Sequence, residues 1–168
     1  MTTRATTRAT TTRATTKAVT RTTRRCAGFA LALGLLVPGI AHASDASLRT
    51  TLGTWSQRIS LDAREIGLSA ANRHPRRLTA RALHFRADAL RARRALASVS
   101  PSSARGRRAK TLALAAFLEY ALVGRAWALA GRARAAHHDT AATKDARVAA
   151  TDAKKANGLL LAADKLLR

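Results

Sequence analysis

Cysteine is almost missing from this 168-residue chain, which has a single one, Cys26. One cysteine cannot form a disulfide within the chain, and no Cys-x-x-Cys-His pattern exists for covalent haem attachment. Proline occurs three times, aromatic residues make up only 4% of the chain, and few runs rich in Val, Ile, Thr and Tyr follow residue 50. These shortages disfavour disulfide-rich and β-rich folds, so we expect an all-α protein.

Acidic residues are also scarce: nine of them face 31 basic residues, for a net charge of +22. Seven of the basic residues and none of the acidic ones fall in residues 1–43, so residues 44–168 keep a net charge of +15. This charge favours anionic partners such as phospholipid headgroups, phosphate-rich wall polymers or nucleic acid. The 25 arginines against six lysines are typical of codon bias in a GC-rich genome, and we expect a bacterial source.

Residues 1–43 have the order of a secretory signal peptide. A low-complexity Thr/Arg region covers residues 1–25, an apolar run covers residues 27–37, and Pro38-Gly39 then breaks that run. The Ala-x-Ala pattern at residues 41–43 is a cleavage signal, so we predict that the mature chain begins at Ser44 and contains no cysteine. An uncleaved membrane anchor fits less well, because the apolar run is short and interrupted. We therefore expect a secreted or cell-envelope protein.

The export route and the start codon leave alternatives open. Thr23-Arg24-Arg25 resembles a twin-arginine motif, but Phe29 lies too far downstream, so the general secretory route fits better. The stretch before the apolar run is long for a signal peptide, and a start at Val19 instead of Met1 would give it an ordinary length.

Residues 44–168 show four amphipathic patterns separated by short breaks. Apolar residues recur every three or four positions in stretches beginning after Ser44, at Pro75, near Ala104 and after residues 137–140. Short turns between such helices predict an antiparallel four-helix bundle with up-down-up-down topology as one domain. The residues expected to face the core are Leu48, Leu52, Trp55, Ile59, Ala63, Ile66 and Ala70; Leu78, Ala82, Phe85, Ala89, Ala92 and Leu96; and Ala142, Ala146, Ala149, Ala153, Ala156, Leu160, Ala163 and Leu167.

The stretch 111–129 is apolar almost all the way round, which is typical of a central helix. We expect neighbouring helices to cover both of its stripes and to bury Trp127. Gly124 and Gly131 fall on one stripe, which predicts either a close helix approach or room for a bulky partner. The first stripe is Ala113, Phe117, Tyr120, Gly124, Trp127 and Gly131, and the second is Leu114, Leu118, Leu122 and Leu129.

No motif for catalysis or cofactor binding is present. The sequence has no Gly-x-Ser-x-Gly, Walker or Rossmann pattern, and no histidine follows an acidic residue at the Glu-x-x-His spacing of bundle metal sites. We therefore predict a non-catalytic protein without cofactor or metal ligands. The histidines of the mature chain are His74, His84, His137 and His138.

Glu119 is the only carboxylate within the most apolar stretch. We expect it to pair with an arginine of a neighbouring helix, since a lone buried carboxylate would be costly. Six aspartates are expected at helix starts (Asp45, Asp139) or on polar helix faces (Asp62, Asp88, Asp145, Asp152).

Seven basic residues flank the second predicted turn, with no acidic residue among them. An antiparallel hairpin brings them to one end of the bundle, where they suit phosphate groups. Nucleic acid is a poor candidate, because the protein is expected to be exported and no aromatic residue is interleaved for base stacking. Codon bias on a solvated face is the competing explanation. The residues are Arg91, Arg93, Arg94, Arg105, Arg107, Arg108 and Lys110.

The composition as a whole is similar to that of small alanine- and arginine-rich exported proteins of GC-rich Gram-positive bacteria. Our leading hypothesis is an exported, non-catalytic bundle that binds an anionic surface or polymer, cell wall or phospholipid, through its basic end. The alternative is an interaction, dimerising or chaperone-like bundle that offers the apolar face of its third helix to a protein partner or to a second copy. An enzyme has the least support.

Overall fold

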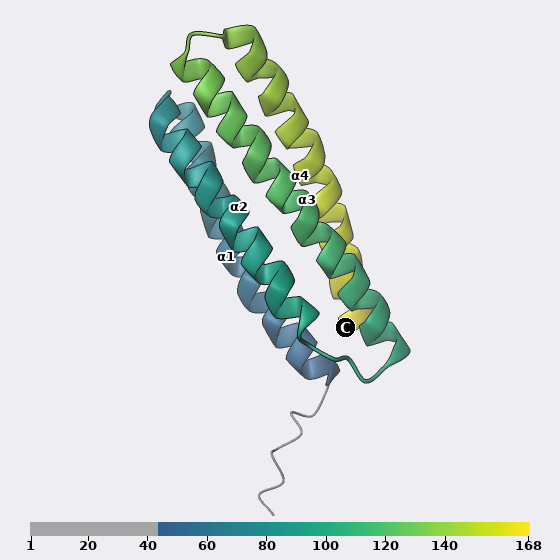
Figure 1. The fold of residues 1–168 in the computed structure, drawn as a ribbon. Coiled ribbons are helices and arrows are strands. Elements are labelled where there is room, and N and C mark those ends of the chain that lie inside the picture. The colour runs from purple at the N-terminus through teal and green to yellow at the C-terminus, as the bar shows by residue number, and fades with distance from the viewer. Residues whose placement is uncertain (1–43) are drawn as a thin grey trace, which may run out of the picture. The chain divides into compact units, whose positions relative to one another are not determined.

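The structure of the protein is a computed structural model that describes residues 44–168. These residues belong to one compact unit. This part of the chain has four helices and no strand: α1 (Asp45–Ala71), α2 (Pro75–Ala97), α3 (Ala104–Ala135) and α4 (Asp139–Leu167). The predicted all-α, antiparallel four-helix bundle is thereby confirmed (Figure 1). The predicted signal peptide and the alternative start at Val19 lie outside the described residues.

The helix ends follow the local sequence. Ser44 and Ser103 cap α1 and α3, each hydroxyl oxygen accepting a hydrogen bond from the backbone N–H three residues later. Pro75 is the first residue of α2, where its missing N–H leaves no bond unmade. The turns after α1 and α3 each contain one residue with left-handed backbone, Arg73 (φ 54°) and His137 (φ 59°), which reverse the chain at the same end of the bundle (Figure 1).

Helix α3 lies between α2 and α4, while α1 packs mainly against α2 and touches α3 and α4 at few points (Figure 1). Gly124 and Gly131 allow the close approach of α2 and α3, as predicted. A Cβ on Gly124 would lie 2.8 Å from the backbone oxygen of Ala82, and one on Gly131 would lie 3.0 Å from that of Pro75. These two positions therefore need glycine to keep the backbones at this separation.

The centre of the core is aromatic. The ring of Tyr120 packs edge-on to Phe85 (centroids 5.9 Å apart, planes at 85°) and at the same distance from Phe117. Its hydroxyl donates a 2.5 Å hydrogen bond to Asn157 Oδ1 on α4, and burial raises the pKa of this phenol. The fully buried seam of α4 consists of Ala142, Ala149, Ala156 and Ala163.

The prediction that both stripes of α3 are covered is wrong for the leucine stripe. Leu118, Leu122 and Leu129 remain between 40 and 43% exposed, and Leu114 is half-buried. The reason is the placement of α1, which packs on α2 and leaves the outer face of α3 to solvent. By length and composition α3 is the one described helix that could span a membrane, but half of its most apolar window is buried in the bundle.

Two further burial predictions need correction. Trp55 and Trp127 are half-buried at the edge of the core rather than enclosed by it. Ala63 is exposed, because the inward face of α1 continues from Ile59 through Asp62 instead.

Candidate functional site

Four of the seven predicted anion-binding residues donate hydrogen bonds within the described part of the chain. Arg94 Nε donates to the backbone oxygen of Leu90 (3.4 Å) and Arg107 Nη1 to that of Ser102 (3.1 Å), while Arg91 and Lys110 are held more firmly. Arg91 Nη1 lies 2.8 Å from Asp88 Oδ1 on the same helix. Lys110 Nζ donates to the backbone oxygens of Ala97 and Val99, both at 2.7 Å, and so caps the C-terminal end of α2. Arg91 and Lys110 thereby hold the fold together and are not free to bind an anion.

The other five predicted residues form what we call the basic loop cluster. All are exposed, and none has a carboxylate oxygen within 4 Å among residues 44–168. The α2–α3 turn brings them to the same end of the bundle as the start of α1 and the C-terminus (Figure 1). They are Arg93, Arg94, Arg105, Arg107 and Arg108.

Asp45 fixes the loop that carries the cluster. Its carboxylate accepts hydrogen bonds from the backbone N–H groups of Ser102 (3.1 Å) and Ser103 (3.3 Å), and from the Ser103 hydroxyl. The bonds from Ser103, together with that from Ser102, hold the pKa of this carboxyl below its ordinary value. Gly106 lets α3 start against Asp45, because a Cβ there would overlap the carboxylate.

The loop joins the negative C-terminal end of the α2 dipole, which Arg94 faces in the last turn, to the positive N-terminal end of the α3 dipole. Arg105 stands in the first turn of α3, with Arg107 and Arg108 just after it, and that turn contains no acidic residue. A helix N-terminus carries partial positive charge, so cations there cost about 0.3–1 kcal/mol each, while an anion would be favoured. The cluster can therefore attract phosphate or carboxylate groups, and it offers no group for acid–base or nucleophilic chemistry.

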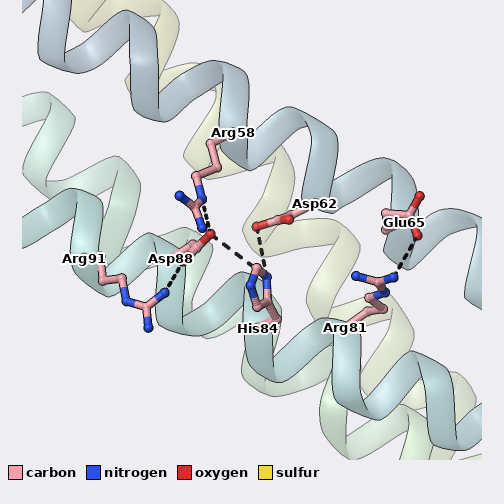
Figure 2. Close-up of polar contacts among 7 residues, drawn as sticks. All are labelled: Arg58, Asp62, Glu65, Arg81, His84, Asp88 and Arg91. Carbon is pink, nitrogen blue, oxygen red and sulfur yellow. Dashed lines mark hydrogen bonds and ion pairs between the residues drawn. The ribbon is translucent and has the colours of Figure 1, made fainter. Parts of the chain in front are cut away.

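A second group of charged residues lies between α1 and α2 and is centred on Asp88 (Figure 2). The prediction that Asp88 lies on a polar face is wrong, because its side chain is fully buried. Arg58 Nε of α1 donates to Asp88 Oδ2, and Arg91 Nη1 donates to Oδ1. Burial acts to raise the pKa of Asp88, but these two hydrogen bonds outweigh it and hold the pKa below its ordinary value.

His84 and Asp62 complete this group. His84 Nδ1 lies 3.5 Å from Asp62 Oδ2 and 4.0 Å from Asp88 Oδ2 (Figure 2). Asp62 was also expected on a polar face, yet only 17% of its side chain is exposed, and its buried Oδ2 has no hydrogen-bond partner. Burial raises the pKa of Asp62, with the proximity of Asp88 adding to the effect and His84 opposing it. Nearby, Glu65 Oε2 lies 3.6 Å from an Arg81 nitrogen.

The sequence held a signal for both buried carboxylates. Asp88 stands three residues after Phe85 and four before Ala92, and Asp62 has the same spacing between Ile59 and Ile66. Residues spaced three and four apart share one helix face. The periodicity that placed the apolar residues inside therefore placed these aspartates beside them.

Glu119 has an interhelical partner, as expected, but the partner is a lysine. Its Oε1 lies 2.6 Å from Lys155 Nζ of α4, and only 15% of the Glu119 side chain is exposed. The hydrogen bond from Lys155 to this carboxylate raises the pKa of the lysine. This pair ties α3 to α4.

Comparison of the chain with protein-family models, with curated proteins and with solved structures gave no match.

Proposed function

We propose that the protein is an exported, non-catalytic binding module that holds a phosphate-bearing polymer or lipid surface through the basic loop cluster. The single observation that carries this proposal is the exposed position of five arginines at one turn with no carboxylate partner among residues 44–168. Arginine binds phosphate with two parallel hydrogen bonds, so several exposed guanidinium groups without carboxylate partners at one end favour a multivalent anion.

Grouping these arginines costs the folded protein some stability, which also supports a role in binding. Arginines at the start of α3 oppose the helix dipole, and the cluster arginines repel one another over distances within about 8 Å at physiological salt. The loop itself is held rigidly by Asp45, so the arginines project from a fixed support. The predicted signal peptide would deliver the module to the cell envelope, where anionic lipids and wall polymers are the partners it would meet.

The experiment compares three forms of the protein. Arg94, Arg105 and Arg108 are changed together to Gln, and a matched control changes three exposed cations of α4 to Gln: Lys144, Arg147 and Lys154. Lys155 is left alone because it pairs with Glu119. Binding is measured to polyphosphate, to vesicles of phosphatidylglycerol with phosphatidylcholine, and to vesicles of phosphatidylcholine alone.

We expect the cluster variant to lose binding to the anionic probes, while the α4 variant keeps most of it and neither form binds neutral vesicles. The polymer and the vesicles together decide which source of phosphate is preferred. Equal losses in the two variants would mean that net charge alone drives binding, and the proposed site would then be wrong.

The exposed leucine stripe favours one alternative function. Leu118, Leu122 and Leu129 present an apolar face on α3 that a second copy or a protein partner could cover. Such association would persist at high salt, unlike binding through arginines. Sedimentation velocity of the wild type and of Leu122→Asp in high salt separates the two: salt-resistant dimers lost in the variant would favour the alternative.

A further inference from the structure

Three metal-ligating side chains from two helices converge beside the α1–α2 interface. Asp62, His84 and Asp88 each offer one ligand atom, and these atoms all lie within 4.8 Å of one another. His84 Nδ1 lies 3.5 Å from Asp62 Oδ2 and 4.0 Å from Asp88 Oδ2. Ligands bound about 2.0–2.2 Å from one zinc ion in tetrahedral geometry are separated by about 3.3–3.6 Å. The three atoms therefore need to move by less than an ångström to share an ion.

One buried oxygen of the Asp62–His84–Asp88 group lacks a hydrogen-bond partner within the described residues. The buried Oδ2 of Asp62 has no hydrogen-bond partner within the described structure and points toward His84 (Figure 2). Buried polar atoms in folded proteins are nearly always bonded, and those that are not call for a missing partner such as an ion. Asp88 beside it is fully buried, so the carboxylate pair lies in a poorly solvated place where a cation would be strongly attracted.

Asp88 is held through both of its oxygens, and the arginine on one of them could be replaced by a metal ion. Arg91 binds Oδ1 and can remain there, orienting the carboxylate from outside the site. Arg58 binds Oδ2, the oxygen nearer to His84, and its side chain is half-exposed. Arg58 lies over the ring of Trp55 at 5.6 Å while it is bonded to Asp88, and this contact does not itself involve the carboxylate.

We propose that Asp62 Oδ2, His84 Nδ1 and Asp88 Oδ2 form a binding site for a divalent transition-metal ion of the zinc class, with the ion taking the place of Arg58 on Asp88. One imidazole nitrogen and two carboxylate oxygens suit Zn²⁺ or Co²⁺, with water at the remaining position. Calcium and magnesium prefer all-oxygen sites, so they should compete poorly. This site is independent of the basic loop cluster.

The exchange with Arg58 makes a prediction that a simple ion-pair network does not make. Arg58 competes with the metal for Asp88 Oδ2, so Arg58→Gln should strengthen Zn²⁺ binding by about tenfold, whereas removing a residue that supports a metal ligand weakens binding by about tenfold or more. If the residues serve only as ion pairs, the same substitution loosens the interface without creating any gain in zinc affinity.

The experiment uses the full chain carrying Cys26→Ser, so that no thiol competes for the metal. Equilibrium dialysis measures Zn²⁺ binding, and the visible absorption of Co²⁺ reports the coordination. The variants are His84→Gln, Asp62→Asn and Arg58→Gln. The matched control is His138→Gln, which removes an exposed histidine at the α3–α4 turn next to Asp139. Circular dichroism without metal establishes that each variant is folded.

We expect one zinc ion per chain, weakened at least about tenfold in His84→Gln and Asp62→Asn, unchanged in His138→Gln, and little affected by excess Ca²⁺ or Mg²⁺. His84 is exposed, so its variant should fold even if Asp62→Asn does not. The proposal is overturned if His84→Gln binds zinc like the parent, if His138→Gln loses the ion instead, or if no saturable binding occurs.

Discussion

Removing both arginines from Asp88 should destabilise the protein more than the two single substitutions together. Arg58 and Arg91 are each about half-exposed while Asp88 is fully buried. In Arg58→Gln or Arg91→Gln one cation remains, so each single change should cost about 1 kcal/mol of unfolding free energy, because solvent screens half-exposed pairs. In the double variant the buried carboxylate has no hydrogen-bonded cation, which costs about 3–5 kcal/mol near neutral pH.

The stability difference between the wild type and the double variant should also depend on pH. In the wild type the pKa of Asp88 is held below its unfolded value, so its stabilising contribution is present above the unfolded pKa and is lost as pH falls through the folded pKa. In the double variant burial is no longer outweighed and raises the pKa of Asp88 above the unfolded value. The folded variant then binds the extra proton, so its deficit relative to the wild type should shrink between about pH 7 and pH 5.

Urea unfolding followed by far-UV circular dichroism measures this difference. The control is Arg64→Gln with Arg93→Gln, which removes one exposed arginine without an ion pair among the described residues from each of the same two helices. We expect the control to change stability by less than about 0.5 kcal/mol. A double variant whose loss equals the sum of the singles and does not vary with pH would refute the assignment of Asp88 as a buried, charged centre.

Three further substitutions test the packing. Gly124→Ala should lower the free energy of unfolding by about 1–3 kcal/mol, because the new Cβ would meet a backbone oxygen of α2 at 2.8 Å. Gly158 has open space around it, so Gly158→Ala should instead raise this free energy by about 0.5–1 kcal/mol. Equal effects of the two substitutions would contradict the close approach of α2 and α3. Trp127→Ala should lower the thermal midpoint by the equivalent of about 2–3 kcal/mol, less than for an enclosed tryptophan; an unchanged melt would place this ring outside the core edge. Tyr120→Phe should lose about 1 kcal/mol in urea unfolding by removing the hydrogen bond to Asn157, and an unchanged midpoint would argue that this bond contributes nothing.

The helices and their ends could be predicted from sequence because each depends on local signals. Ser44 and Ser103 supply caps, Pro75 opens α2, and apolar spacing identifies the inner faces. The exposed leucine stripe of α3 could not be predicted in this way. Whether a second apolar face is covered depends on where a helix distant in sequence packs. In this bundle α1 packs against α2 and makes few contacts with α3.

The candidate sites likewise combine features that local sequence determines with features that depend on packing between helices. Grouping of the arginines at one turn follows from a helical hairpin, so the basic loop cluster was accessible from sequence. That Arg91 and Lys110 are engaged elsewhere depends on side-chain geometry across a turn. The spacing of Asp62 and Asp88 fits inner helix faces, although we expected both on polar faces. The meeting of Asp62 with His84 depends on the register between α1 and α2, which no local pattern records.

The salt dependence of polyphosphate binding tests the proposed function most directly. It is measured for the wild type, for the variant with Arg94, Arg105 and Arg108 changed to Gln, and for the α4 control, between about 50 and 200 mM salt. If the cluster binds phosphate, the slope of log affinity against log salt should become shallower by up to about 3 in the cluster variant, at roughly 0.9 for each lost contact, and by less than about 1 in the control. Equal changes of slope in the two variants would contradict a site at the α2–α3 turn.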